Sequence, residues 1–303
     1  MSSRGLPMRG PGSPARLRGM SKAQDHTLIA MPWRALHQWH AGLAHAFTRI
    51  DTADALRCLA QALGHLVSVE SVMISLERKD QPPQSLYLQG IPEQYRESVI
   101  ERYFSGGYLL DPFCLAVEQG LAEGFYHLEE IAPDDFFDSD YYKAYYLKGG
   151  CSEDSYFIVD VGNQSKVSLS LFQGFGGQAL STGQLDLLRA VEPMVRQFIR
   201  QFAQCNRLIT QQEAVAAPAT VDLKPSIQHA FEHFGCEVLT EREREVAHMV
   251  LRGHSVKSTA NELRIAAETV RMHRKNLYLK LAINSQSELF ALFIEWLRQD
   301  RIA

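Results

Sequence analysis

Long apolar runs, closely spaced cysteines and a secretory leader are all missing from this sequence of 303 residues. No apolar run approaches the length of about 18 residues that a membrane-spanning helix requires, so no membrane partner is expected. The five cysteines lie far apart without a C-x-x-C pair, which argues against a disulfide framework and a zinc site. The N-terminal residues lack the apolar segment of a signal peptide, and a cytoplasmic protein is the expectation.

Motifs for common catalytic and signalling chemistry are missing too. The sequence contains no P-loop G-x-x-x-x-G-K-[ST], and it does not assemble the acidic pair, aspartate and lysine of a receiver domain. No nucleophile stands out together with a base, so we expect neither an enzyme nor a cofactor. His37, His40 and His45 are spaced too unevenly for one helical face, so no metal site is expected.

What the sequence does contain is the composition of a soluble globular protein, with 46% hydrophobic and 22% charged residues. The length favours two domains. The formal charge of −4 is unevenly distributed: from Leu239 onward there are 11 Lys or Arg residues against 8 Asp or Glu, a net charge of +3. Such asymmetry is typical of proteins whose basic part contacts nucleic acid.

The pattern along the chain predicts an N-terminal α+β sensor-like domain, an antiparallel sheet flanked by helices, over residues 30–205. Residues 1–29 are rich in Arg, Gly, Pro and Ser and are predicted to be a disordered tail, with Met20 as an alternative start. Residues 206–236 are predicted to be a linker, with a short helix from Ser226 to Phe234. Within the domain we expect helices from Trp33, Asp51, Pro92, Asp111, Asp134 and Gly183, and hairpins over 71–88 and 155–172.

Residues 237–303 predict an all-α domain of four helices. Thr240 and Glu243 form a capping box, Gly253 ends the first helix, and Ser255 caps the second. A break of about three residues at Arg264 then separates the second helix from a third, which is the spacing of a helix-turn-helix. The buried side of the third helix is predicted to carry Val270, Leu277 and Leu281. The fourth helix, after Ser285, carries Leu289, Leu292, Phe293 and Trp296, which are expected to pack against the other helices or against a second copy of the chain.

These residues resemble the LuxR-type transcription regulators, whose DNA-binding domain has the pattern L-T-x-R-E-x-E-V, G, A-x-x-L-x-I-S-x-x-T-V-x-x-H and K-L. The matching residues are Leu239, Thr240, Arg242, Glu243, Glu245, Val246, Gly253, Ala260, Leu263, Ile265, Thr269, Val270, His273, Lys280 and Leu281. A run of basic residues is usually only a solvated helix face, but the agreement of caps, turn and apolar register favours DNA contact.

The resemblance implies a homodimer on double-stranded DNA, with the third helix in the major groove. It further implies that Arg271, Met272 and Lys275 face the bases, that Lys257, Arg274 and Lys280 contact phosphates, and that Thr269 belongs to the same surface. We expect the long helix from Gly183 to form part of the dimer surface.

Four positions depart from the family pattern. Ala266 stands where the family usually has the Ser that caps the recognition helix, a difference that generally costs about 0.5 to 2 kcal/mol. Thr259 replaces Ile, Val256 replaces Asn, and Gln286 replaces an Arg, which removes one charge able to contact phosphate. These differences concern individual contacts and not the family pattern as a whole.

The N-terminal domain contains two aromatic candidates for a small-molecule site. Tyr103 and Tyr108 precede an Asp-Pro pair at Asp111, as in the acyl-homoserine-lactone-binding domains of this family, although the tryptophans used there are missing between Trp39 and Trp296. The second candidate is the cluster of Tyr141, Tyr142, Tyr145 and Tyr146 on a predicted helix, with Tyr141 and Tyr145 as its expected ligand residues.

Each candidate has an ordinary structural explanation. Asp-Pro also starts helices, and clustered tyrosines also form cores. The predicted function is therefore a DNA-binding transcription regulator that senses a small molecule. The alternatives are an N-terminal protein-interaction or dimerisation module without a ligand, and a lactone quorum-sensing receptor.

Overall fold

The computed structural model describes residues 31–78, 81–104, 106–174, 176, 178–208 and 227–299. The predicted disordered tail lies outside these residues, as does most of the predicted linker. Within the described residues no helix is both long enough and apolar enough to cross a membrane.

The N-terminal domain contains five strands and seven α-helices among its described residues, with short 3-10 and π-helical turns between them. Its elements are α1 (Trp33–Phe47), α2 (Asp54–Leu63), β1 (Ser71–Arg78), β2 (Gln84–Gln89), α3 (Glu93–Arg96), α4 (Arg102–Phe104), α5 (Pro112–Glu118), β3 (Gly124–His127), α6 (Leu128–Ile131), β4 (Glu153–Gly162), β5 (Ser165–Gln173) and α7 (Thr182–Cys205).

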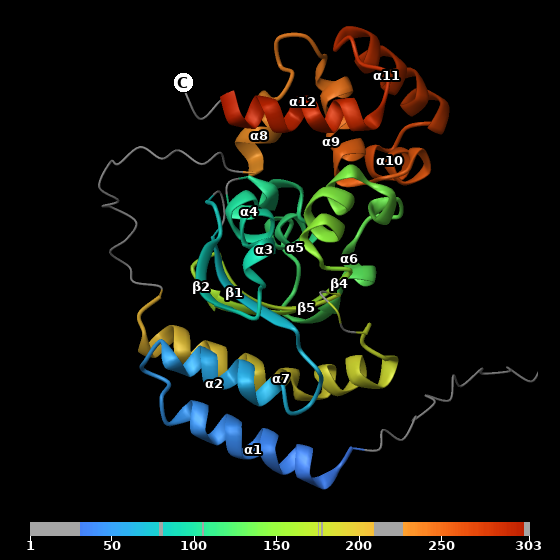
Figure 1. The fold of residues 1–303 in the computed structure, drawn as a ribbon. Coiled ribbons are helices and arrows are strands. Elements are labelled where there is room, and N and C mark those ends of the chain that lie inside the picture. Colours follow the sequence, from blue (N-terminus) through green and yellow to red (C-terminus); the bar gives the residue numbers. More distant parts are fainter. Residues whose placement is uncertain are drawn as a thin grey trace, which may run out of the picture. The chain divides into compact units, whose positions relative to one another are not determined.

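The strands form one antiparallel sheet in the order β2-β1-β5-β4-β3. Figure 1 shows α2 and α7 against one face of this sheet, with α1 outside them, and α3 to α6 on the opposite side. Both predicted hairpins are confirmed, as β1–β2 and β4–β5. The predicted fold class, an antiparallel sheet flanked by helices, is therefore confirmed.

Side chains of opposite chemistry line the two faces of the sheet, because neighbouring residues of a strand point to opposite sides. The face toward α2 and α7 is apolar and contains Val72, Ile74, Leu76, Phe157, Val159, Val167, Leu169 and Leu171. The face toward α4 and α5 contains the buried residues Met73, Ser75, Glu77, Asp154, Tyr156, Ile158, Ser168, Ser170 and Phe172. We call the first the apolar face and the second the polar face.

Two local predictions differ from the structure. Strand β3 was not predicted, because its sequence GFYH has only four residues and no clear alternation. The helix expected over residues 134–150 is instead a 3-10 turn at Phe136–Asp138, a π-helical turn at Tyr142–Tyr146 and a final 3-10 turn. It does end at the paired glycines, where Gly150 has φ 79°.

The C-terminal region is helical, as expected. Its elements are α8 (Ile227–His233), α9 (Glu241–Arg252), α10 (Val256–Leu263), α11 (Ala267–Lys280) and α12 (Gln286–Gln299). The short helix predicted between Ser226 and Phe234 is thus present as α8. It leads to Phe234, whose ring centroid lies 5.0 Å from that of Phe293 in α12. The four predicted helices of the helix-turn-helix domain are α9 to α12.

Local capping determines where α9 and α10 begin and end. The Thr240 hydroxyl accepts a hydrogen bond from the Glu243 backbone N–H, and the Glu243 carboxylate accepts one from the Thr240 N–H. Gly253 ends α9 in the left-handed conformation, with φ 87°. The Ser255 hydroxyl then accepts a hydrogen bond of 3.1 Å from the Ser258 N–H. All three predicted caps are confirmed.

Candidate DNA-binding surface and ligand site

The turn between α10 and α11 has the geometry of a helix-turn-helix connection. Arg264 follows α10 with φ 53°, a left-handed conformation that turns the chain out of the helix. The Ile265 N–H donates to the Ala260 carbonyl over 3.0 Å, which closes the end of α10. Helix α11 then begins after Ala266, which provides no side-chain cap, in agreement with the sequence.

Helix α11 has one face buried in the domain and another directed to solvent. Val270 and Leu277 are buried as predicted, while Leu281, which follows α11, is half-buried. Arg271, Lys275 and Met272 are exposed, and Met272 keeps 52% of its surface accessible. An exposed thioether between two cations has no role in a domain core. The residues that the sequence assigns to base contact therefore share the outer side of α11.

The remaining residues of the predicted DNA surface lie at its edges. Lys257 is exposed on α10, and Thr269 is half-buried in the first turn of α11. Arg271 forms an exposed ion pair of 2.7 Å with Glu268, one turn earlier on the same helix. Such a pair contributes little in water and leaves the guanidinium group available.

Arg274 and Lys280, predicted to contact phosphates, have partners inside the domain. The Arg274 guanidinium group donates to the Tyr278 hydroxyl over 3.1 Å and to Gln286 Oε1 over 3.3 Å. Gln286 also donates from Nε2 to the Val250 carbonyl. The glutamine that replaces the family's Arg thus connects α11 to α9.

Lys280 forms an ion pair with the buried capping residue of α9. Its Nζ lies 2.7 Å from Glu243 Oε2, and the Glu243 side chain is only 4% exposed. Burial opposes ionisation of Glu243, but the bonds from Lys280 and Thr240 outweigh it and hold the pKa of this carboxyl below its usual value. Sequence reasoning missed this role, because the partners are 37 residues apart.

Four of the five predicted ligand residues meet in one small cavity on the polar face of the sheet. Tyr103, Asp111, Tyr141 and Tyr145 line a volume of about 30 Å³, together with Met73, Tyr146, Cys151, Tyr156 and Phe172. We call this the tyrosine cavity. This volume is far below the range of about 300 to 1,000 Å³ that small-molecule sites usually have.

Ring packing gives the tyrosine cavity its shape. The Tyr141 and Tyr145 rings stack with centroids 4.8 Å apart, and the Tyr156 ring stacks on Phe113 at 3.5 Å. A Cβ atom at Gly107 would lie 2.4 Å from the Tyr145 ring. Glycine at position 107 therefore allows Tyr145 to close one side of the cavity.

Asp111 has both of the roles that its sequence context allows. It is the N-cap of α5, where Oδ1 accepts hydrogen bonds from the Phe113 N–H over 2.7 Å and the Cys114 N–H over 3.2 Å. It also lines the tyrosine cavity. Burial raises the pKa of Asp111 to about 7, and the two backbone bonds offset this only in part.

Several buried polar atoms around the tyrosine cavity make no hydrogen bond with the described residues. They are the hydroxyl oxygens of Tyr141 and Tyr146 and Oδ2 of Asp154. The other oxygen of Asp154 accepts from the Ser170 hydroxyl over 2.6 Å. Buried polar groups usually have partners, so these atoms are suited to a polar ligand group.

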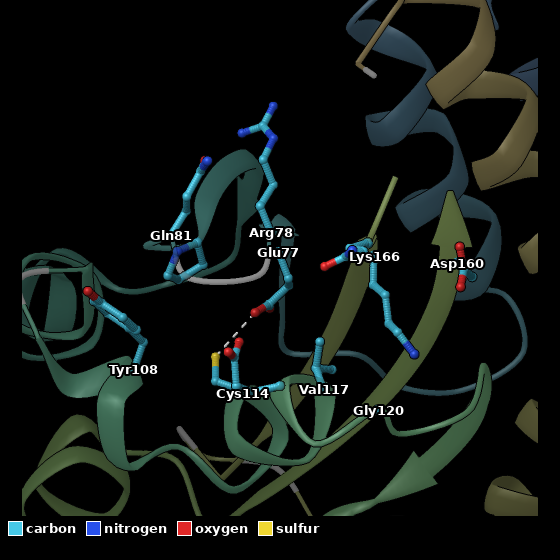
Figure 2. A pocket seen from close by; sticks show the side chains of 12 residues that line it. Glu77, Arg78, Gln81, Tyr108, Cys114, Val117, Gly120, Asp160 and Lys166 are labelled. Carbon is cyan, nitrogen blue, oxygen red and sulfur yellow. Dashed lines mark hydrogen bonds between the residues drawn. The ribbon is translucent and has the colours of Figure 1, made fainter. Parts of the chain in front are cut away.

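Tyr108, the fifth predicted ligand residue, lines a different and larger cavity of about 350 Å³. Figure 2 shows this cavity with Tyr108, Cys114 and the carboxyl group of Glu77 on its wall. We call it the Glu77 cavity. Cys114 Sγ lies 3.3 Å from Glu77 Oε2 and 3.2 Å from the hydroxyl of Tyr103, which lines the tyrosine cavity. Cys114 therefore connects the walls of the two cavities.

Glu77, Asp154 and Tyr156 were not predicted as site residues, whereas Tyr146 belongs to the predicted tyrosine cluster. A signal was present in the polar residues at alternate positions of β4 and β5, which is unusual for buried strands. No group of three or more side chains placed to hold a metal ion occurs in the parts of the chain described above.

The fold and these surfaces define a two-domain DNA-binding regulator. The family model for "Bacterial regulatory proteins, luxR family" matches residues 237–293. An HTH-type transcriptional regulator in the exeN 3′ region of Aeromonas salmonicida is 35% identical over 188 residues, covering 62% of this chain and 94% of that protein. The chain belongs to the LuxR family of HTH-type transcriptional regulators, which is a family of DNA-binding proteins and not a class of enzymes.

Other similarities are partial. The regulator MalT of Yersinia pestis is 30% identical over 115 residues, which span 32% of this chain and 13% of MalT. Among solved structures, the VqsR LBD domain of Pseudomonas aeruginosa has a TM-score of 0.48 at 24% identity, over 55% of this chain and 97% of that one. Escherichia coli SdiA has a TM-score of 0.39 at 15% identity, over 85% and 96%. These TM-scores are too low to assign a ligand to this chain.

Proposed function

We propose that this regulator binds DNA as a homodimer through α10 and α11, and that a small polar molecule bound at the tyrosine cavity modulates this binding. The DNA-binding part of this proposal rests on Arg271, Met272 and Lys275, which are exposed on the side of α11 opposite its buried face. An Arg or Lys in the major groove can bind the N7 and O6 acceptors of guanine. A regulator that binds chromosomal DNA in a bacterium acts in the cytoplasm, and this is the location we propose.

The test of the DNA surface begins with a preferred sequence, selected from random DNA by the full-length chain. Arg271→Ala is expected to reduce discrimination between this sequence and random DNA by about 1 to 3 kcal/mol. Lys257→Ala is the matched control. Loss of an exposed phosphate contact should weaken binding to both kinds of DNA equally and reduce the salt slope by about one. Lys280 is less suitable, since its replacement would also leave the α9 cap without its ion pair. If both variants bound like the parent, the assigned surface would be wrong.

The long helix α7 supports the proposed dimer. Its buried side includes Leu188, Val195 and Phe198, yet Met194 on the same helix is 47% exposed. A second copy of α7 would cover this side chain. Met194→Glu is therefore expected to shift the chain toward monomer in sedimentation equilibrium, whereas Met194→Leu should not. An unchanged association constant for Met194→Glu would remove α7 from the dimer surface.

The polar face favours a polar effector over a long acyl chain. Asp111 and several tyrosines line the tyrosine cavity, and the hydroxyls of Tyr141 and Tyr146 have no hydrogen-bond partner among the described residues. Burying such groups against hydrocarbon costs free energy. Tyr141→Phe removes one of these hydroxyls and should weaken the response of DNA binding to an effector without changing DNA affinity in its absence.

A further inference from the structure

The buried carboxyl group of Glu77 faces a cavity, and its hydrogen-bond partners among the described residues are all neutral. The residue is 8% exposed and lines the Glu77 cavity. Its Oε1 accepts hydrogen bonds from the hydroxyls of Ser168 over 2.5 Å and Ser75 over 3.2 Å. Its Oε2 accepts from Cys114 Sγ. All three partners are neutral donors, so the charge of an ionised Glu77 has no counterpart among these contacts.

The basic residues of the same cavity are engaged elsewhere. Arg78 donates to Gln84 over 3.1 Å and to the Leu208 carbonyl over 3.5 Å. Lys166 is the cross-strand neighbour of Glu77, but its Nζ donates to the Leu121 carbonyl, and no ion pair joins the two among the described residues. Figure 2 shows the Arg78 and Lys166 side chains directed away from the Glu77 carboxyl group.

The difference in burial between Glu77 and the two basic residues determines which sign of charge the cavity favours. Arg78 and Lys166 are half-buried and hydrogen-bonded to neutral acceptors, whereas Glu77 is buried. Burial raises the pKa of Glu77, and the bonds from Ser168, Cys114 and Ser75 offset this only in part. A positive group placed at the carboxylate would favour the ionised form. An anion would instead meet Glu77, Glu118 and Asp160 on the same wall.

We propose that the Glu77 cavity binds a small organic cation, an ammonium or guanidinium group on a short apolar chain, with its positive nitrogen hydrogen-bonded to Glu77. The volume of about 350 Å³ is within the range of small-molecule sites. Tyr108, Val117 and Pro83 supply apolar surface for the chain. The cavity is separate from the tyrosine cavity, and cation binding itself does not depend on the proposed regulation of DNA binding.

Cys114 would connect such binding to the tyrosine cavity. A cation at Glu77 Oε2 competes with the Cys114 thiol for the same oxygen, and the thiol also contacts the Tyr103 hydroxyl. Tyr103 and Asp111 line the tyrosine cavity. If the proposed effector function holds, this path couples a cation bound in the Glu77 cavity to the effector site in the tyrosine cavity.

The test uses the full-length chain and n-butylammonium chloride as the probe, with binding followed by ligand-observed NMR and by the thermal midpoint at constant ionic strength. Saturable binding is expected in the millimolar range that suits so small a molecule. Glu77→Gln keeps the size and an acceptor oxygen but removes the charge, and it should weaken binding about tenfold or more. Asp160→Asn is the matched control, since Asp160 is an exposed carboxylate at the rim of the same cavity.

Two further probes act on the parent protein and so do not depend on the folding of a variant. n-Butanol has the same length without the charge, and butyrate has the opposite charge; neither should bind saturably at the concentrations that saturate with butylammonium. Saturable binding of butyrate would assign the cavity to anions and overturn the proposal. Equal affinity of n-butanol and butylammonium, equal affinity of Glu77→Gln and the parent, or an equal loss in Asp160→Asn would overturn it too.

The same samples separate this proposal from the proposed function. DNA affinity in the presence and absence of butylammonium measures regulation, while NMR measures binding alone. Binding that depends on Glu77 but leaves DNA affinity unchanged would uphold the cation site and contradict its part in regulation. If the unliganded parent fails to bind DNA, the proposed regulatory function is contradicted. The cation titration alone then decides whether the Glu77 cavity is a cation site.

Discussion

The apolar face of the N-terminal sheet packs hydrocarbon against α2 and α7, whereas the polar face presents serines, carboxyl groups and tyrosines toward α4 and α5. Both faces are buried, so exposure to water does not explain the difference. Apolar burial stabilises a fold, while buried polar atoms cost stability unless they are hydrogen-bonded. The polar face is therefore expected to stabilise the fold less than the apolar face does.

The largest expected effect comes from the apolar face. Phe157 is fully buried there, with its ring 4.9 Å from that of Phe125. Phe157→Ala is expected to lower the free energy of unfolding by about 3 to 5 kcal/mol, because it removes apolar contacts and leaves a cavity. The measurement is urea unfolding of the full-length chain. Tyr156→Phe, on the adjacent residue but the opposite face, should change it by about 1.5 kcal/mol or less. Equal losses would mean that the two faces do not differ as described.

A second prediction concerns pH. Asp111 has a pKa of about 7 in the folded chain against 3.8 as its ordinary value. Between these values the folded chain holds a proton that the unfolded chain has released, so the free energy of unfolding should fall as pH rises from about 4 to 7. The effect is at most about 4 kcal/mol. Burial also raises the pKa values of Glu77 and Asp154, which act in the same direction.

The C-terminal domain is expected to respond to acid in the opposite way. Burial, together with Arg252 and Arg244, lowers the pKa of His248 to about 3 from 6.5. The unfolded chain then binds the extra proton, so this domain should lose stability as pH falls from about 6.5 to 3. The fluorescence of Trp33 and Trp39 in a Trp296→Phe background reports on the N-terminal domain, and hydrogen exchange along α9 reports on the C-terminal one. In Asp111→Asn the N-terminal slope between pH 4 and 7 should flatten; an unchanged slope would contradict the assignment to Asp111.

The smallest expected effect is on the polar face. Ser168→Ala removes one hydrogen bond to Glu77 and should lower the free energy of unfolding by about 1 kcal/mol. A double-mutant cycle with Glu77→Gln measures the coupling of the pair, expected at about 0.5 kcal/mol or more for residues in contact. Additive changes would show that the serine does not stabilise the carboxyl group, and the polar face would then lack the network described above.

Features that depend on neighbouring residues could be predicted from the sequence. Thr240, Gly253 and Ser255 act on backbone groups within three or four positions, so their types alone indicate where helices begin and end. The missing cap at Ala266 could be predicted for the same reason. Strand β3 could not, because a four-residue strand is defined mainly by its pairing with β4.

Four of the residues proposed for a ligand site, Tyr103, Asp111, Tyr141 and Tyr145, line one cavity in the structure. The Tyr145 ring closes one side of this cavity beside Gly107, and Tyr108 lines a different cavity. Both features follow from ring positions that no local pattern encodes.

By itself, the sequence determined the helix-turn-helix, its caps and the exposed side of α11, because helical periodicity and capping act over a few residues. Only the tertiary structure decided that Lys280 pairs with Glu243, that Gln286 joins α11 to α9, and that Glu77 is buried at a cavity wall. These contacts join residues far apart in the chain. Their charge balance depends on burial and distance, which arise when the sheet and helices pack together.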